Sequence, residues 1–362
     1  MSARRIVITV HDFFRGGTER GAIRLAREWV EAGRDVTILC GSLEGGLRGE
    51  VDARVAVVTL EPPMPRSLLS RFRLGRAMGR VLPGLNADIV FLPGNFHLPL
   101  APGLRQADPR PVLVQQISNP PLPAGLAGTA VRPVFRFLAR SVDGFAAMNG
   151  GQMQDVKRLM PGKPVILLRP PFEIAAPAAR QARSGGPHRI LWVGRLEPQK
   201  DAPLALETIA ALNRIVPAHL TILGTGAQRE DLQRRIAAMG LSDQITLLSH
   251  VADLAAPYAD ADALLITSRY EGGPAVAVEA LAQGTPVVST DCSPMLREVL
   301  TEPASGIIVP SRAPDALAAA LAAVCRGQRP PLEELRALAT PFLPPVSARA
   351  YLDWFDTLVR HG

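Results

Sequence analysis

Two basic and two acidic residues in the C-terminal half are of types that bind anions and hydroxyl groups. Arg195 and Lys200 lie five residues apart. Glu271 and Glu279 lie eight residues apart. Guanidinium and ammonium groups bind phosphate-like anions, whereas ionised carboxylates accept hydrogen bonds from the hydroxyls of a sugar or a ribose. Two glutamates near a helix start could also be ordinary charges that the helix dipole favours, so the surrounding pattern has to decide.

The stretch around the two glutamates, residues 263–309, has the order strand, glycine-rich turn, helix and strand. It consists of an apolar run, two glycines and a proline, a helix pattern of small residues and a second apolar run (263–266, Gly272 to Pro274, 275–283 and 286–289). The glycines allow the backbone to approach a ligand closely, and Pro274 suits the first helical position. The helix N-terminus then presents unpaired N–H groups and a partial positive charge, so we expect an anion to bind there.

The N-terminal residues predict a second unit of the same kind. Residues 4–10 read as a buried strand, Gly16 and Gly17 fall in the following loop, and a helical pattern at 19–32 leads into a strand at 36–40. In such a βαβ unit the loop lies at the carboxyl end of the first strand, where parallel sheets bind ligands. The spaced glycine fingerprint of dinucleotide-binding folds is absent, so no dinucleotide cofactor is predicted.

The composition of the 362 residues is that of a globular protein, with 47% hydrophobic and 20% charged residues. Aromatic residues make up only 5% of the chain. They leave little from which to build a base-stacking surface, and we expect no nucleic acid partner. The three cysteines, Cys40, Cys292 and Cys325, fit neither a zinc spacing nor a disulfide framework, so a reducing compartment is expected.

Positive charge is concentrated in the first half of the chain. Through Arg180, Lys and Arg number 24 and Asp and Glu number 14, a net charge of +10. The remainder has 16 basic and 19 acidic residues, a net charge of −3, which together give the +7 of the whole chain. Such asymmetry indicates that one domain meets an anionic surface.

The segment Arg66–Arg80 predicts a basic amphipathic helix able to lie on an anionic bilayer. It alternates apolar residues with five arginines and contains no acidic residue (Arg66, Arg71, Arg73, Arg76 and Arg80). The alternative is a helix whose leucine side packs on a sheet and whose arginines face water. A second basic segment at 132–140 favours membrane contact. The apolar stretch at 6–10 is too short for a signal peptide or a span, so we expect a cytoplasmic protein, peripheral on the inner face of the membrane.

Short apolar runs separated by helix patterns continue through both halves, as in doubly wound α/β domains. They lie at 88–92, 111–117, 144–148 and 165–168 in the first half, and at 190–193, 220–223 and 245–248 in the second. We therefore expect an N-terminal domain at 1–172, a linker rich in Ala, Pro, Gly and Ser at 173–187, and a C-terminal domain at 188–344. Residues 345–362 are expected to form a final helix.

These motifs resemble those of the family 4 retaining glycosyltransferases, and the resemblance covers nearly the whole chain. The most specific parts are Glu271-Gly-Gly-Pro with Glu279, the following EALAQGTPVVSTD, and VGRLEPQKD. Supporting parts are Gly16-Gly17-Thr18-Glu19-Arg20, LGTG at 223–226 and the segment 306–310. The resemblance implies the GT-B fold, in which two Rossmann-like, doubly wound domains face each other across a cleft and the last helix crosses back to the first domain.

The resemblance implies that the C-terminal domain holds a nucleoside-diphosphate sugar, the donor. The implied catalytic residues are Arg195 and Lys200, on the donor diphosphate, and Glu271, which faces the transferred sugar or the adjoining phosphates. Glu279 takes the ribose hydroxyls, and Glu19 is near the acceptor. The remaining implied donor-binding residues are Gly16, Gly17, Gly272, Gly273, Pro274 and Ala275. Two cations and a helix N-terminus would stabilise the departing diphosphate, so we expect no metal and no cofactor.

The sequence departs from the family pattern in three places. Many members carry a histidine after the strand at 111–116, where this chain makes Gln116 and Ser118 the local acceptor-side candidates. His11 and His97 are the alternatives, although a lone loop histidine is more often structural. A glycine, Gly273, replaces the usual aromatic residue and predicts a smaller, more mobile loop. His250 stands where many members have glycine, either near the nucleobase or in an exposed turn.

The favoured function is retaining transfer of a sugar to a lipid-linked or surface-glycan acceptor, as in polysaccharide biosynthesis. A second hypothesis keeps the fold and changes the chemistry to a nucleotide-sugar epimerase or a soluble metabolite glycosyltransferase. A third is a non-catalytic nucleotide-sugar-binding partner of a glycan assembly complex. The presence of Arg195, Lys200, Glu271 and Glu279 together argues against the third hypothesis, because a non-catalytic binding protein has little need of all four residues.

Overall fold

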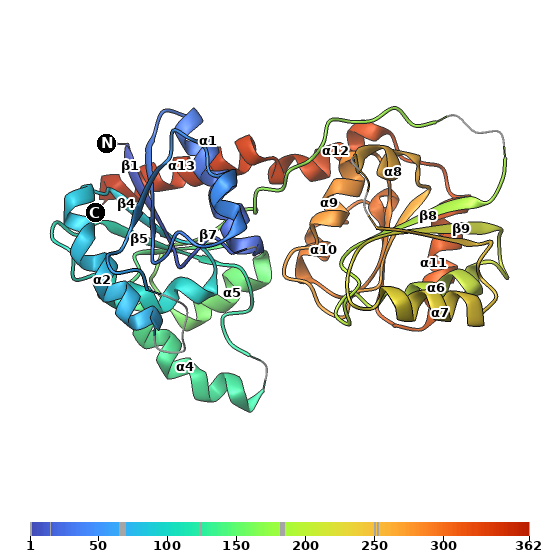
Figure 1. Cartoon of the computed structure of the whole chain (residues 1–362), viewed down its shortest axis with the longest axis horizontal. Coiled ribbons are helices and arrows are strands. Elements are labelled where there is room, and N and C mark those ends of the chain that lie inside the picture. Colours follow the sequence, from blue (N-terminus) through green and yellow to red (C-terminus); the bar gives the residue numbers. More distant parts are fainter. Residues whose placement is uncertain are drawn as a thin grey trace. The chain divides into compact units, whose positions relative to one another are not determined.

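The chain folds as two compact units, each built on its own sheet (Figure 1). Unit 1 comprises Met1–Pro171 and Pro344–Gly362, and unit 2 comprises Phe172–Leu343. The computed structural model describes residues 2–14, 16–64, 70–123, 125–181, 185–249, 251 and 253–361. In that part of the chain no helix is both long and apolar enough to cross a bilayer.

Unit 1 contains a sheet of seven parallel strands in the order β3-β2-β1-β4-β5-β6-β7. The strands are β1 (Arg5–Val10), β2 (Asp35–Cys40), β3 (Ala56–Thr59), β4 (Ile89–Leu92), β5 (Val112–Ile117), β6 (Gly144–Ala147) and β7 (Val165–Leu167). Strands β1, β4 and β6 are buried almost throughout, as expected of a sheet that is covered on both faces.

Helices cover both faces of the unit 1 sheet. One face packs against α1 (Gly17–Glu31) and α13 (Pro344–His361). The other packs against α2 (Ser70–Leu85), α3 (Ala101–Leu104), α4 (Leu126–Ala139) and α5 (Gly150–Leu159). Two short 3-10 segments, η1 (Gly46–Glu50) and η2 (Asn95–Leu100), lie in the connections. The result is a three-layer α/β/α arrangement.

The final helix, α13, completes the core of unit 1 with aromatic side chains. The ring of Phe355 lies 5.3 Å from that of Trp29, and the ring of Tyr351 lies 5.5 Å from that of Phe91. The Trp29 indole donates to the carbonyl of Ala348 at 3.2 Å. The end of the chain is therefore part of the N-terminal fold, as Figure 1 shows for the red helix beside α1.

Unit 2 repeats this architecture with six parallel strands in the order β10-β9-β8-β11-β12-β13. The strands are β8 (His188–Val193), β9 (Ala218–Leu223), β10 (Ile245–Leu248), β11 (Ala263–Ile266), β12 (Val287–Thr290) and β13 (Gly306–Val309). One face packs against α6 (Ala202–Leu212), α7 (Arg229–Ala238) and α11 (Pro314–Arg326). The other packs against α8 (Ala255–Asp260), α9 (Ala275–Ala282), α10 (Pro294–Val299) and α12 (Leu332–Ala339). The segments η3 (Pro303–Ser305) and η4 (Thr340–Phe342) complete the unit.

The predicted α/β class with two doubly wound sheets is confirmed. Each predicted strand begins and ends within two residues of an observed strand. The four-residue edge strands β3 and β13 were not predicted, although their sequences, AVVT and GIIV, are largely apolar. Pro274 is the residue before α9 rather than its first helical residue, and its ψ of 90° is extended.

The segment that composition predicts as a linker is attached to unit 2 over its first residues. The amide of Gln283 donates to the carbonyls of Ala175 and Ala176 at 3.0 and 3.2 Å, and its oxygen accepts from the N–H of Ala178 at 2.9 Å. Ile174 packs against the core beside α9. The absence of a helix or strand period in the first residues of this segment therefore reflects an extended path along the surface of unit 2.

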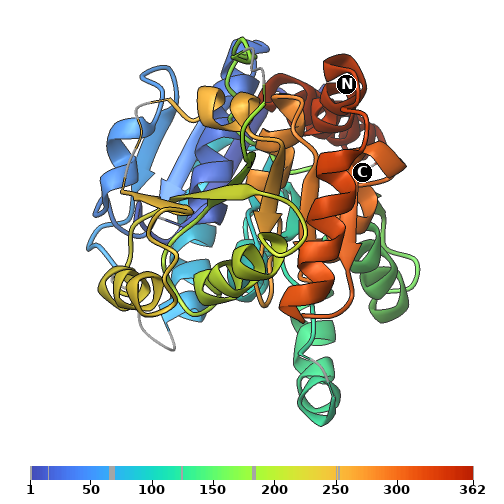
Figure 2. The ribbon, with the colours of Figure 1, turned by 90° about the vertical axis from the view of Figure 1, so that its right-hand side faces the viewer.

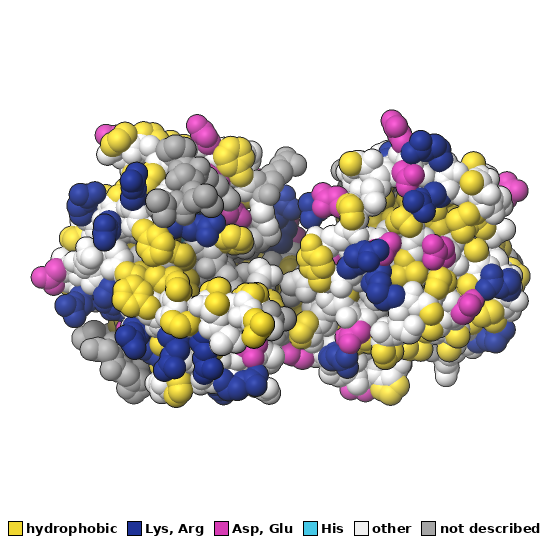
Figure 3. All heavy atoms as spheres, turned by 90° about the horizontal axis from the view of Figure 1, so that it is seen from below, with side chains coloured by type: hydrophobic (Ala, Val, Ile, Leu, Met, Phe, Trp, Pro, Cys, Tyr) yellow, Lys and Arg dark blue, Asp and Glu magenta, His cyan; other side chains and the backbone are white. Residues whose placement is uncertain are grey.

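The predicted membrane helix, 66–80, overlaps α2, which runs on to Leu85, and the apolar side of α2 packs in the core. Leu74, Met78 and Leu82 are buried against the sheet. Arg73, Arg76 and Arg80 lie on the exposed side, and Arg66 lies outside the described residues. Of the two interpretations of this segment, the one in which the leucine side packs on the sheet describes α2. Figure 3 shows arginine and lysine side chains gathered on the unit 1 face that is seen from below.

The aromatic contact between α13 and the sheet predicts a unit-specific loss of stability. Phe355→Ala should lower the unfolding free energy of unit 1 by about 3–5 kcal/mol, because the ring is fully buried and its loss leaves a cavity. Hydrogen exchange followed peptide by peptide should show the loss of protection in unit 1 alone. Phe72→Ala, at a site that is 45% exposed, is the control and should change little. Equal loss in both units would contradict the assignment of α13 to unit 1.

Candidate active site

The strand order of unit 2 fixes where its functional loops meet. Strands β8 and β11 are neighbours, and the chain leaves them toward opposite sides of the sheet. Between such strands the loops diverge and leave a crevice at the carboxyl edge, which is where doubly wound sheets bind ligands. The loop after β8 carries Arg195 and Lys200, and the loop after β11 carries Glu271.

Lys200 and Glu271 form a direct ion pair across this crevice. The ammonium of Lys200 lies 2.5 Å from Oε1 of Glu271, with side-chain exposures of 16% and 9%. The same carboxylate oxygen accepts from the hydroxyl of Ser268 at 2.7 Å. The N–H of Glu271 donates to the carbonyl of Cys292 at 2.8 Å, which fixes the loop backbone. The structure therefore brings together two of the residues that the sequence nominated.

A network of hydrogen bonds beside the Lys200–Glu271 pair joins the two loops, and the sequence analysis did not predict it. The Thr267 hydroxyl donates to the carbonyls of Lys200 and Asp201 at 2.9 and 2.8 Å, and accepts from the Trp192 indole at 2.9 Å. Arg312 donates to the Asp201 carboxylate at 2.6 Å and to the carbonyls of Ser268 and Thr267 at 2.9 and 3.0 Å. The network holds Lys200 and Ser268 in register.

Asp201 has a left-handed backbone conformation, with φ of 52° and ψ of 54°. Aspartate tolerates this region better than most residues, but the conformation still carries strain that the surroundings have to offset. Arg269 and Arg312 both pair with its carboxylate, at 2.8 and 2.6 Å. The aspartate at the end of VGRLEPQKD is thus the sequence signal that could have indicated the network.

The LGTG turn supports the loop that carries Arg195. The N–H of Leu196 donates to the carbonyl of Thr225 at 2.8 Å. A Cβ at Gly224 would lie 2.0 Å from the carbonyl oxygen of Gly194, so only glycine allows this approach. The Arg195 guanidinium pairs with Glu197 at 2.9 Å and its side chain is 65% exposed. Arg195 is therefore accessible on the same loop as Lys200.

Glu279 lies within α9, beyond the first turn of the helix, and its carboxylate has a polar neighbour. Its carboxylate accepts from the hydroxyl of Tyr258 at 2.8 Å. Burial, and next the charge of Glu279, raise the pKa of Tyr258 well above its ordinary value of 10.0, so this hydroxyl stays protonated and donates. Both residues line a cavity of about 310 Å³ that is also bounded by Leu254, Gln283 and the start of the attached segment, residues 173–175.

Residues Gly272 to Ala275 lead into α9, and no side chain caps the N-terminus of this helix. The N–H groups of its first turn therefore point out of the helix on the side of the Glu271 loop. A Cβ at Gly273 would meet the end of the Met295 side chain at 2.3 Å, so a larger residue at this position needs Met295 to move.

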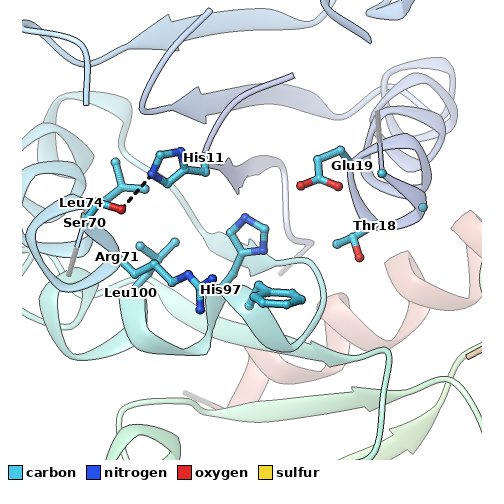
Figure 4. A pocket seen from close by; sticks show the side chains of 11 residues that line it. His11, Thr18, Glu19, Ser70, Arg71, Leu74, His97 and Leu100 are labelled. Atoms are coloured by element: carbon cyan, nitrogen blue, oxygen red, sulfur yellow. Dashed lines mark hydrogen bonds between the residues drawn. The ribbon is translucent and has the colours of Figure 1, made fainter. Parts of the chain in front are cut away.

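Unit 1 has a cavity at the corresponding place, between the loops that follow the neighbouring strands β1 and β4. Its volume is about 310 Å³. It is lined by His11, Gly16 to Glu19, Ser70, Arg71, Leu74, Phe96, His97 and Leu100. Figure 4 shows His11 and His97 on one side of this cavity and Thr18 and Glu19, at the start of α1, on the other. Strand order again places the cavity at the switch point.

Both histidines of this cavity are held by neighbours. His11 is 7% exposed, and its ring nitrogens lie 3.2 Å from the Asp12 carboxylate and 3.3 Å from the Ser70 hydroxyl. His97 is 4% exposed and its Nδ1 contacts the carbonyl of Pro93. Opposite them, a Cβ at Gly16 would lie 2.3 Å from the carboxylate of Glu19, so the glycine makes room for this side chain.

The two polar candidates after β5 have different environments. Gln116 is 6% exposed and donates to the hydroxyl of Tyr351 on α13 at 2.8 Å, which makes it a link to the core. It is not among the residues that line the cavity. The N–H of Ser118 donates to the side-chain oxygen of Asn95 at 2.8 Å. The hydroxyl of Ser118 lies beside Gly94, close to Thr18. His250 lies outside the described residues.

Among the described residues, no group of three or more His, Cys, Asp and Glu side chains is arranged to hold a metal ion. The chemistry that the unit 2 loops offer is instead electrostatic. The Lys200 ammonium, the exposed Arg195 guanidinium and the start of α9 belong to neighbouring loops at one sheet edge. The Glu279 carboxylate, which can accept hydrogen bonds from hydroxyl groups, lies in α9. Such a set suits a ligand with phosphates at one end and a polyol at the other.

Comparisons with known proteins agree with this arrangement. The model of Glycosyl transferases group 1 matches residues 177–339, and that of the Glycosyl transferase 4-like domain matches residues 16–171. A glycosyltransferase from Rickettsia africae has a TM-score of 0.79 at 14% identity over 99% of both chains. The lipopolysaccharide outer core galactosyltransferase WaaB has a TM-score of 0.75 at 17% identity over 96% of this chain and 98% of that one.

The two Rossmann-like units therefore define a protein of the GT-B fold class. The chain belongs to the group 1 glycosyltransferases of the family 4 type. A glycogen synthase of Mycobacterium tuberculosis is 30% identical over 56% of this chain and 50% of its own length. A D-inositol 3-phosphate glycosyltransferase of Geodermatophilus obscurus is 35% identical over 37% and 32%, respectively. The chain thus spans half or less of the length of these curated relatives.

The network that joins the two loops of unit 2 predicts a role for Arg312. Arg312→Gln should lower the unfolding free energy of unit 2 by about 1–3 kcal/mol, because it removes hydrogen bonds to one carboxylate and two carbonyls. Arg214→Gln breaks an ion pair whose side chains are 67% and 81% exposed, and should cost almost nothing. Urea unfolding of the two variants measures the difference, and equal costs would show that the network does not stabilise the loops.

Proposed function

We propose that this chain is a retaining glycosyltransferase that moves a sugar from a nucleoside-diphosphate sugar to a lipid-linked or surface-glycan acceptor. The observation that carries the proposal is the Lys200–Glu271 pair, at 2.5 Å, on the two loops that leave the switch point of the unit 2 sheet. Family membership supports it, because residues 177–339, which match Glycosyl transferases group 1, include Arg195, Lys200, Glu271 and Glu279.

The donor fits the unit 2 loops in one orientation. Its diphosphate would contact Lys200, Arg195 and the first N–H groups of α9, which bring positive charge to this edge. Its ribose hydroxyls would donate to Glu279, whose carboxylate Tyr258 already holds in place. The cavity of about 310 Å³ beside Glu279 would then accept the nucleobase.

In the proposed reaction the bond between the sugar carbon and the diphosphate oxygen breaks, and a new bond to the acceptor oxygen forms on the same face. The leaving phosphate oxygen takes the proton of the acceptor hydroxyl, so no protein nucleophile is needed. Negative charge grows on the diphosphate as the sugar departs. Lys200, Arg195 and the helix N-terminus stabilise this charge, which is the role that a metal ion has in other enzymes, and we propose a metal-independent reaction.

The acceptor is proposed to bind in the unit 1 cavity. His11, His97 and Glu19 offer hydrogen bonds to sugar hydroxyls, whereas Leu74, Leu100 and Phe96 offer apolar contacts. Glu19, Ser118 and the backbone at Gly16 and Gly17 remain the acceptor-side and donor-side residues that the family resemblance nominates. The same proposal includes peripheral attachment to the inner face of a membrane, supported by the exposed arginines of α2, which are Arg73, Arg76 and Arg80.

Loss of the cations should slow sugar transfer. Lys200→Ala and Arg195→Ala should each remove about 2–4 kcal/mol of transition-state stabilisation, a fall in kcat/KM of roughly a hundredfold or more. Release of nucleoside diphosphate from the donor measures the effect without a known acceptor. Lys157→Ala, an exposed site on α5, is the control. If both active-site variants keep the wild-type rate, the assignment of the diphosphate position is wrong.

A thermal-shift screen should identify the donor base. One of the UDP-, GDP-, ADP- or dTDP-sugars should raise the melting temperature by mass action, and HepE of Anabaena, whose structure contains UDP and glucose, makes UDP the first choice. Glu279→Ala should weaken this binding by roughly tenfold to a hundredfold, since hydrogen bonds to a charged group are worth about 1.5–3 kcal/mol. Tyr258→Phe should weaken it less. Unchanged affinity in Glu279→Ala would rule out the ribose contact.

A further inference from the structure

Helix α4 of unit 1 has an apolar side that the unit does not cover. Figures 1 and 2 both show α4 standing out from the body of unit 1. Its exposed apolar residues are Leu126, Val131, Val134 and Phe137, with exposed fractions of 90%, 43%, 53% and 62%. Leu126, Val134 and Phe137 follow one another at multiples of helical spacing, with Ala130 between them, so they form one stripe along the helix.

The stripe is separate from the side of α4 that packs on the unit. Phe135, Leu138 and Ala139 face the core and are at most 6% exposed. The helix therefore has two apolar sides, of which only one is used in folding. Exposed apolar stripes of this kind mark interaction sites more often than isolated surface residues do.

A row of arginines borders the exposed stripe. Arg132, Arg136 and Arg140 follow at intervals of four residues, and residues 126–140 include no Asp or Glu. Within the part of the chain that the structure describes, no carboxylate lies within ion-pair distance of these three guanidinium groups. The surface thus combines an apolar stripe with uncompensated positive charge, the pattern of helices that lie in the interface of an anionic bilayer.

The neighbouring segments extend the same face. Helices α2 and α4 both pack against η2 and α3. Phe96 of η2 is 62% exposed, and Arg71 of α2 lies 4.6 Å from the centre of its ring. The exposed side of α2 adds Arg73, Arg76 and Arg80. Figure 3 shows apolar and basic side chains side by side on this face.

We propose that α4 is a membrane-docking element that inserts the stripe of Leu126, Val134 and Phe137 among the acyl chains of an anionic bilayer while its arginines contact lipid phosphates. Charge complementarity selects an anionic membrane over a neutral apolar partner. The docking element is thus α4, which keeps a free apolar stripe, and the contribution of α2 is electrostatic.

Docking through this face would present the acceptor cavity to the bilayer. Phe96 and Arg71 line both the cavity and the face. An acceptor whose lipid stays in the membrane could then reach His11 and His97 without leaving the bilayer completely. This step rests on the proposed sugar transfer, whereas the docking itself does not.

Co-sedimentation with vesicles tests the docking. The full chain should bind vesicles of phosphatidylglycerol and phosphatidylcholine and should bind phosphatidylcholine vesicles weakly, and salt should weaken the first interaction. Replacing Arg132, Arg136 and Arg140 by Gln should weaken binding by roughly fivefold for each arginine removed. Val134→Ser with Phe137→Ser should weaken it by roughly tenfold or more.

Each variant has a matched control in a different place. Ile215→Ser with Met239→Ser removes two apolar side chains that are 41% and 42% exposed in unit 2. Arg4→Gln, Arg214→Gln and Arg234→Gln remove the same charge from exposed sites. Both controls should bind vesicles like the wild type. Donor-induced thermal shifts should be the same in all variants, which separates docking from sugar transfer.

Phe137→Trp gives a measurement that does not depend on a disruptive change. Its emission should move to shorter wavelength with phosphatidylglycerol vesicles and should be quenched by lipids brominated on the acyl chains. Absence of both effects, or α4 variants that bind like the wild type, would overturn the proposal. So would a wild-type dimer that Val134→Ser with Phe137→Ser dissociates while vesicle binding is unchanged, because the stripe would then belong to a second copy of the chain.

Discussion

The contact between Lys200 and Glu271 is the interaction around which the functional loops of unit 2 are arranged. Both side chains are largely withdrawn from water, with 16% and 9% exposure, and removing two charges from water costs several kcal/mol that their attraction has to offset. The hydroxyl of Ser268 adds a hydrogen bond to the same carboxylate oxygen. A buried pair of this kind is weak evidence for stability, so its presence at a ligand edge is better explained by what it holds ready: an oriented ammonium in a place of low dielectric.

The order of parallel strands determines where such groups can meet. In each unit the chain leaves two neighbouring strands toward opposite sides, β8 and β11 in unit 2 and β1 and β4 in unit 1. Loops at these positions have no crossover helix between them, so they diverge and leave room for a ligand at the carboxyl edge of the sheet. This explains why Lys200 and Glu271, 71 residues apart, touch each other. It also explains why His11 and His97 face one cavity from two separate loops.

Sequence patterns predicted the fold and nominated candidate residues in both units because the signals for both are local. Apolar runs show strands that are buried on both faces, and glycines mark the turns that follow them. The contacts that hold the candidate residues in place join distant parts of the sequence. The bond from Arg312 to Asp201 spans 111 positions, and that from Gln116 to Tyr351 spans 235. Gln116 looked like an acceptor-side group because a final helix expected to cross back to this domain does not identify Tyr351 as the partner of Gln116.

The two basic segments of unit 1 show how far composition alone can lead. Segments 66–80 and 126–140 both combine arginines with large apolar residues and lack acidic ones. The difference lies in how many apolar rows each helix has. Helix α2 has one row, in which Leu74, Met78 and Leu82 are needed by the sheet. Helix α4 has two, and the core uses only the row with Phe135 and Leu138.

The second row of α4 cannot be explained by the folding of unit 1. Phe137 and Val134 are 62% and 53% exposed, so they realise little of the roughly 1.5–3 kcal/mol that burial of such a side chain contributes. The arginines beside it are likewise not needed for folding, because no carboxylate among the described residues pairs with them. Two features with no role in the fold of the unit, placed on one side of one helix, are most simply explained by a single surface outside the chain that satisfies both.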